Sequence, residues 1–171
     1  GALANGAFAG VSPDGTLYVT SAHMLANLFS IIGPRAGGPG AVGGATAGLF
    51  ETATGTAVAG SDIAAGAMMA MFSPDSAHIA FTDLAIDTGR GIAVMDFDMA
   101  QRKASGYRQI YATGDAARYP GWPFYLPDNN ALVFTIGAAP DFSGLGVGVI
   151  AGSPVIGAPV TDLFFVDVVG G

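Results

Sequence analysis

A turn motif built on proline and aspartate recurs three times along the chain and limits what the chain can fold into. Each copy leads into a short apolar run. The three copies are Val11-Ser12-Pro13-Asp14, Phe72-Ser73-Pro74-Asp75 and Leu126-Pro127-Asp128. Proline fixes its own φ at the value that the first central position of a tight turn requires, and aspartate bonds nearby backbone amides. A motif kept at three places predicts three copies of one structural unit.

The run after each turn has the period of a β-strand. In residues 78–82, Ile79 and Phe81 share one face, whereas His78, Ala80 and Thr82 share the other. A second signature follows in each copy, an apolar strand that ends near an acidic residue, at 48–52, 93–97 and 163–167. Short strands joined by short turns pair antiparallel most easily, so the pattern predicts an all-β protein.

Two segments, Phe72-Ser73-Pro74-Asp75 through Ile79-Ala80-Phe81 and then Ala93-Val94-Met95-Asp96, resemble the TolB-type, WD-like β-propeller repeat. The resemblance covers nearly the whole chain as one propeller segment, residues 1–171. It implies about three four-stranded antiparallel blades, at 1–60, 61–113 and 114–171. The usual repeat has Ser-Pro-Asp-Gly at its turn. This chain has the glycine only at Gly15, and it has Leu126 in place of the serine before the third proline. A propeller typically has at least four blades, so we expect a partial propeller or one completed by another chain.

The composition excludes several classes of protein. Charged residues make up only 11% of the chain, against a usual share of about 25%. Glu51 is the only glutamate and Lys103 the only lysine, which argues against a helical protein. The net charge of −7 argues against a nucleic-acid-binding protein, which would normally show a basic patch. No apolar run reaches the roughly 18 residues of a membrane span, and the absence of cysteine excludes disulfides.

Two glycine-rich insertions lengthen the outer units, at 23–44 and 137–161. Both fall between the second and third expected strands and both are apolar. They could pack back on their own sheets or contact another chain. Residues 118–124 contain too many prolines for a central strand along their whole length, and we expect Trp122 and Phe124 to pack between sheets. Because the chain begins at Gly1, we expect a processed or excised piece.

No catalytic, cofactor or metal site is predicted. His23 and His78 are the only histidines, too few for a zinc site. No Gly-x-Ser-x-Gly elbow is present. The glycines at 144–148 lack a glycine at the third glycine position of the nucleotide-binding motif Gly-x-Gly-x-x-Gly. A calcium cluster is not favoured, because the spacing of its candidate residues does not match an EF-hand loop; these residues are Asp83, Asp87, Asp96 and Asp98.

These observations favour a noncatalytic module that acts as a protein-binding or assembly scaffold. Arg118, Tyr119 and Trp122 are the candidate partner contacts, because these residue types dominate the energetic centres of interfaces. Packing between blades is the alternative role of Trp122. The partner would be another protein or a second copy of the chain, with no nucleic acid and no membrane span. Two alternatives stay open: the propeller part of a larger hydrolase, and a structural subunit of a surface polymer. The resemblance implies a periplasmic or extracellular setting.

Overall fold

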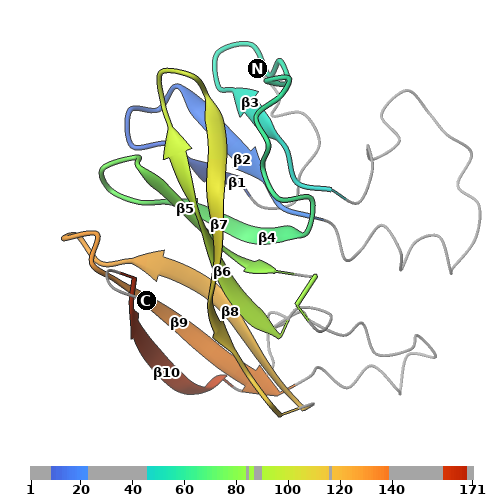
Figure 1. Ribbon diagram of the computed structural model, residues 1–171, viewed down its shortest axis with the longest axis vertical. Helices are drawn as coiled ribbons and strands as arrows, with labels where there is room; N and C mark the ends of the chain where they lie inside the picture. Colours follow the sequence, from blue (N-terminus) through green and yellow to red (C-terminus); the bar gives the residue numbers. More distant parts are fainter. Residues whose placement is uncertain are drawn as a thin grey trace, which may run out of the picture.

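A computed structural model describes residues 9–22, 46–83, 85–86, 90–115, 117–138 and 160–168. Within these residues the protein is all-β, with three small antiparallel sheets that follow one another along the chain (Figure 1). The first sheet contains β1 (Ala9–Val11), β2 (Leu17–Thr20) and β3 (Leu49–Glu51). The middle sheet contains β4 (Ala67–Phe72), β5 (His78–Asp83), β6 (Gly91–Asp98) and β7 (Lys103–Ala112). The third sheet contains β8 (Arg118–Tyr125), β9 (Ala131–Ala138) and β10 (Val160–Asp167).

The middle sheet lies between the other two and is buried on both faces. Ile79 and Phe81 of β5 belong to the apolar cluster shared with the first sheet, and Ala80 belongs to the cluster shared with the third. This confirms the alternation expected for residues 78–82. Figure 1 shows the three sheets stacked in chain order. Burial on both faces is seen in β5, where Ile79 and Phe81 on one side and Ala80 and Thr82 on the other are all buried.

Each of the three Pro-Asp turns has four residues, of which the proline is the second and the aspartate the third. All three are closed by the same backbone hydrogen bond, from the amide of the fourth residue to the carbonyl of the first. The bonds are Gly15 to Ser12 (2.8 Å), Ser76 to Ser73 (2.9 Å) and Asn129 to Leu126 (3.0 Å). The fourth residue is left-handed in every copy, with φ of +73° at Gly15 and +63° at both Ser76 and Asn129. The turns are therefore equivalent in structure as well as in sequence.

Side chains reinforce the first two turns in the same way. Ser73 Oγ donates to Asp75 Oδ1 over 2.6 Å and accepts from the His78 amide over 2.9 Å. Ser12 makes the matching bonds to Asp14 (2.6 Å) and Leu17 (3.0 Å). The third turn has leucine in place of this serine, and leucine has no hydroxyl for such bonds. In all three turns the aspartate Oδ1 also accepts from the amide two residues further on: Thr16 to Asp14 (3.0 Å), Ala77 to Asp75 (3.0 Å) and Asn130 to Asp128 (3.1 Å).

The expectation of four strands in every sheet is wrong for the outer sheets, which have three strands each within the described residues. In the first sheet a rudiment of the fourth strand is present: the Val58 amide donates to Leu49 over 2.8 Å, and the Glu51 amide donates to Thr56 over 2.9 Å. The chain turns at Gly55 (φ +71°), and left-handed residues at Gly60 and Asp62 then end the pairing. The three sheets do not close into a ring within the described residues.

Matching bulges shape the first strands of the middle and third sheets. Met69 and Trp122 stand at the same distance before their turn prolines, both have φ of +54°, and the strand register shifts at both. Each bulged amide donates toward the preceding sheet, from Met69 to Ser21 Oγ (2.7 Å) and from Trp122 to Met69 Sδ (3.3 Å). A bulge frees an amide from the ladder, and here the freed amide ties two sheets together.

β8 runs through the proline-rich segment as the edge strand of the third sheet. Proline donates no ladder bond, so an edge position and a bulge are where a strand tolerates it. This agrees with the expectation that 118–124 is not a central strand. The insertions connect β2 to β3 and β9 to β10, the second and third strands, as expected. The contacts expected of residues 23–44 and 137–161 lie outside the described residues, except at the ends of β9 and β10.

Candidate functional site

The third sheet carries a row of exposed apolar side chains on the face turned away from the middle sheet. Leu163 is 73% exposed, Phe165 61% and Phe124 49%. Side chains alternate across a strand, so the neighbouring Phe164 and Val166 point to the opposite face and pack in the core shared with the middle sheet. The expectation that Phe124 packs between sheets is therefore wrong.

Strand pairing brings this row together from all three strands. Val133 of β9 pairs with Phe165 of β10 on one side and with Phe124 of β8 on the other. Leu163 pairs with Thr135 one step further along the same face. The bulge between Gly121 and Phe124 sets the register that places Phe124 here. We call this set of five residues the outer face: Phe124, Val133, Thr135, Leu163 and Phe165.

Equivalent positions in the other two sheets are buried. The Val133–Phe165 pair corresponds, by its distance from the turn proline and by strand register, to one pair in each preceding sheet. Those pairs are Val19–Leu49 in the first sheet and Ala80–Val94 in the middle sheet, and all four side chains are at most 1% exposed. In each case the next sheet of the chain covers them. The outer face is thus the surface on which a further sheet would stack.

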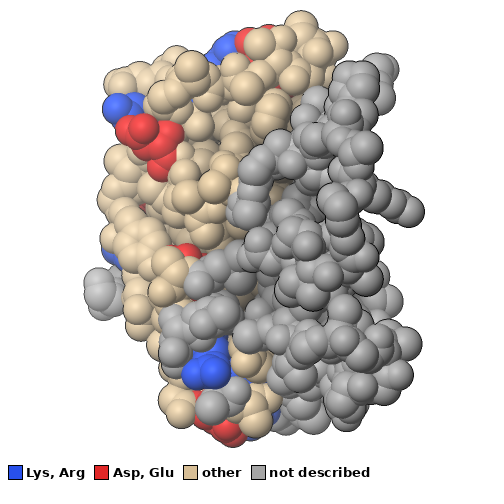
Figure 2. Space-filling view, turned by 90° about the vertical axis from the view of Figure 1, so that its right-hand side faces the viewer, with Lys and Arg blue, Asp and Glu red and all other residues tan. Residues whose placement is uncertain are grey.

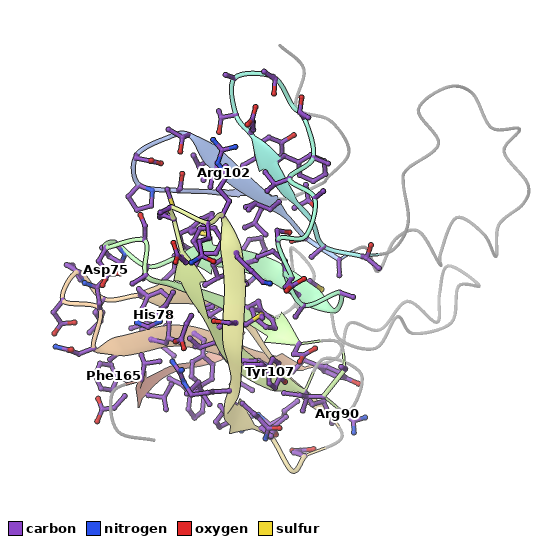
Figure 3. The ribbon with its side chains drawn as sticks, turned by 45° about the horizontal axis from the view of Figure 1, so that its top comes forward. Asp75, His78, Arg90, Arg102, Tyr107 and Phe165 are labelled. Atoms are coloured by element: carbon purple, nitrogen blue, oxygen red, sulfur yellow. The ribbon has the colours of Figure 1, made fainter. Side chains whose placement is uncertain are left out.

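Polar and charged groups gather at two other places, one at each end of the middle sheet. At the turn end, Asp96 Oδ1 lies 2.8 Å from an Arg108 nitrogen and 3.2 Å from His78 Nδ1. Tyr125 stacks beside His78 with ring centroids 6.4 Å apart, and burial raises the pKa of its hydroxyl above the usual value. Figure 3 shows His78 near Asp75 at this end. These contacts join neighbouring strands of the middle sheet, so this cluster supports the sheet.

At the opposite end, the Tyr107 hydroxyl donates to Asp83 Oδ2 over 2.6 Å. Burial, and then this hydrogen bond, raise the pKa of Tyr107. Asp83 is 2% exposed and also accepts from the Ala85 amide over 2.8 Å. Figure 3 places Tyr107 and Arg90 toward this end. Both hydrogen bonds to Asp83 come from groups of the protein itself, so we interpret Asp83 as a structural carboxylate.

The three predicted partner contacts all lie in β8 but do not form one exposed patch. Arg118 is half-buried, and Tyr119 is 3% exposed with the Arg90 guanidinium 5.6 Å above its ring. Trp122 is half-buried at the bulge. Their role as contacts stays a prediction. Sequence reasoning did not single out Leu163 and Phe165 as surface residues, because they occupy the same apolar strand pattern as their buried equivalents in the other two sheets.

Charge does not single out a surface. Figure 2 shows blue and red side chains in small separate groups on the side it displays. Exposed ion pairs join Arg102 to Glu51 (2.6 Å) and Lys103 to Asp62 (3.1 Å). These link the β6–β7 turn and the start of β7 to the end of β3 and to the chain that follows it. Over the part of the chain that the structure describes, no group of three or more His, Cys, Asp or Glu side chains is placed to hold a metal ion. No helix among those residues is long and apolar enough to cross a membrane.

Comparison with known proteins does not place the chain in a family. No family model matches the sequence, and no curated protein matches it. One similar solved structure is described as "Crystal structure of the eukaryotic initiation factor". It is 13% identical, with a TM-score of 0.40, and the match covers 93% of this chain and 34% of that one. This chain thus spans about a third of that chain, and the similarity is too weak to support an argument.

Proposed function

We propose that the chain is a noncatalytic segment of a β-propeller that serves as a protein-binding or assembly scaffold. Three features support the propeller: the equivalent turns, the equivalent bulges at Met69 and Trp122, and the stacking of successive sheets in chain order. Hydrogen bonds between sheets recur as well. The Ala22 amide donates to the Ala67 carbonyl (2.6 Å), and Thr82 Oγ1 donates to the Pro120 carbonyl (3.4 Å); the two acceptors stand at the same distance before their turn prolines.

The binding role rests on one observation, the exposed outer face. An apolar patch of a few hundred Å² on a soluble protein is often a functional surface. Leu163 and Phe165 each expose more than half of their surface, while the equivalents of the outer face in the other sheets are covered. A protein that docks there would bury the face as the following sheet does elsewhere in the chain.

Photo-crosslinking in an extract of the producing organism tests the binding role. A photoreactive phenylalanine analogue replaces Phe165 in one sample and Val11 in a control sample, because Val11 is also an exposed apolar residue at 49% but lies on the first sheet. We expect a defined covalent adduct with a polypeptide from position 165 only. The absence of any adduct from position 165, or identical products from both positions, would contradict the proposal.

A further inference from the structure

We propose that the outer face of the third sheet binds the outer face of a second copy of this chain, in a twofold symmetric dimer. The proposal rests on the proposed binding role and names its partner. Four properties of the molecule support it: the stacking of its own sheets, the surfaces left available, the exposed apolar area and the charge.

Stacking within the chain indicates what kind of surface covers the outer face. The first and middle sheets meet through apolar side chains, and so do the middle and third sheets. The outer face has the same register of side chains as the two covered faces, with Val133 and Phe165 where Ala80 and Val94 stand in the middle sheet. A surface built on this plan packs against another antiparallel sheet, at the spacing of about 10 Å common to stacked sheets.

The available surfaces favour pairing of third sheet with third sheet. A head-to-tail dimer would place the far face of the first sheet on the outer face. That far face offers less apolar surface: Tyr18 is 1% exposed and stacks on Phe50 with centroids 5.2 Å apart, and Thr20 is 3% exposed. Val11, the strand partner of Tyr18, is its one large apolar side chain described as exposed, at 49%. The outer face of a second copy is exposed and can bind without rearrangement. A pair of identical patches related by a twofold axis is also the commonest arrangement in homo-oligomers.

Area sets the expected strength of the dimer. The exposed fractions of Phe124, Leu163 and Phe165 correspond to roughly 370 Å² of surface, if each of these residues exposes about 200 Å² in full. Two copies would bury about twice that from these residues, and more from Val133, Thr135 and the strand edges. Stable interfaces bury about 1,200–2,000 Å², so this dimer belongs at the weak end, with dissociation in the micromolar range.

Charge gives the dimer a distinctive dependence on salt. The five residues of the outer face carry no ionisable side chain, and the exposed Asp167, two residues after Phe165 on the same side of β10, brings one carboxylate per copy to the border of the face. The whole chain has a net charge of −7, so two copies repel each other at long range. Salt screens that repulsion while leaving apolar burial intact, so dimerisation should strengthen as the ionic strength rises.

Sedimentation equilibrium of the purified chain tests the proposal. We expect a monomer–dimer equilibrium in the micromolar range, at least twofold tighter in about 0.5 M salt than in about 0.05 M salt. Phe165→Ser should weaken it at least tenfold, and Val11→Ser should leave it unchanged. Circular dichroism of each variant checks that the fold is kept, and Phe124→Ser is the second outer-face variant if Phe165→Ser does not fold. A monomer up to about 1 mM, or equal weakening by Val11→Ser, overturns the proposal.

Disulfide trapping distinguishes twofold pairing from head-to-tail pairing. The chain has no cysteine, so any disulfide formed by a single introduced cysteine must join it to the same residue of another copy. In a twofold dimer, residues near the axis meet their own copies. Of the variants Phe124→Cys, Val133→Cys and Phe165→Cys, at least one should form a covalent dimer on mild oxidation, and Val11→Cys should not. A dimer that none of the three traps would overturn the twofold arrangement. If the purified chain stays monomeric while position 165 crosslinks a different protein, this proposal fails and the binding role stands.

Discussion

At the scale of single residues, the three turns share one backbone conformation but have different residues at their fourth position. The fourth turn residue has a left-handed backbone in all three copies, which costs an ordinary residue about 1–2 kcal/mol and glycine very little. Gly15 meets this requirement, whereas Ser76 and Asn129 occupy the same conformation with a side chain. Asn129 has a compensating contact, because its Oδ1 accepts a hydrogen bond from the Asp75 amide over 3.2 Å.

Replacing the fourth turn residue should therefore change stability in opposite directions. Ser76→Gly should raise the free energy of unfolding by about 0.5–1 kcal/mol, and Gly15→Ala should lower it by about 1 kcal/mol. Asn129→Gly should gain less than Ser76→Gly, because it loses the bond to the Asp75 amide. Urea unfolding measures all three. A destabilised Ser76→Gly would show that relief of the left-handed backbone is outweighed by the loss of the serine side chain.

The buried turn serine should matter more than an exposed turn threonine. Ser73 is 0% exposed, and its hydroxyl donates to Asp75 and accepts from the His78 amide. Ser73→Ala leaves that amide without this acceptor, so we expect a loss of about 1–3 kcal/mol in the free energy of unfolding. Thr54→Ala, in the exposed turn after β3, is the control and should stay within about 0.5 kcal/mol of the parent. Equal effects from both would contradict the role of burial.

The same serine should make stability depend on pH. The Ser73 hydroxyl holds the pKa of Asp75 below its ordinary value of 3.8. Because the folded pKa lies below the unfolded one, the stabilisation is present above the unfolded pKa and is lost as the pH falls through the folded pKa. The free energy of unfolding should thus fall as the pH drops below about 3.8, and less steeply in Ser73→Ala. Chemical unfolding across that range measures the slopes, and equal slopes would count against the Ser73–Asp75 bond.

At the scale of elements, the strand edges decide how the sheets join. The bulges at Met69 and Trp122 take one amide out of each ladder and aim it at the preceding sheet. The sequence of β5 was sufficient to predict its alternation, because period-two burial is local. The bulges could not be predicted, since nothing in Ala67–Phe72 marks a left-handed methionine, and only the neighbouring Ser21 accounts for it.

Removing the acceptor of the Met69 amide should loosen the joint between the first and middle sheets. Ser21→Ala leaves a buried amide unpaired and should cost about 1–3 kcal/mol in the free energy of unfolding. The exchange of the Met69 amide with solvent should quicken more than that of Ile79, which lies inside the β5 ladder. Hydrogen exchange followed residue by residue makes the comparison, and uniform quickening of both amides would point to a global effect instead.

At the scale of the whole molecule, the middle sheet is covered on both faces and the third on one. Phe81 and Phe165 lie on these contrasting surfaces, at 0% and 61% exposed. Phe81→Ala should lower the free energy of unfolding by about 3–5 kcal/mol through lost burial and the cavity left behind. Phe165→Ala should change it by less than about 0.5 kcal/mol in dilute monomer. Thermal and urea unfolding at low protein concentration measure both losses of stability. Similar losses from the two substitutions would mean that the outer face is covered.

By itself the sequence determined the strand class, the three turns and the alternation of the middle unit, because these depend on φ, on hydrogen bonds within a few residues and on period-two burial. Only the tertiary structure decided which apolar strand faces are covered. Val94 and Phe165 stand at equivalent positions after equivalent turns, yet one is buried and the other exposed. The difference lies in whether another sheet stacks above, and stacking is a contact between distant parts of the chain that no local pattern encodes.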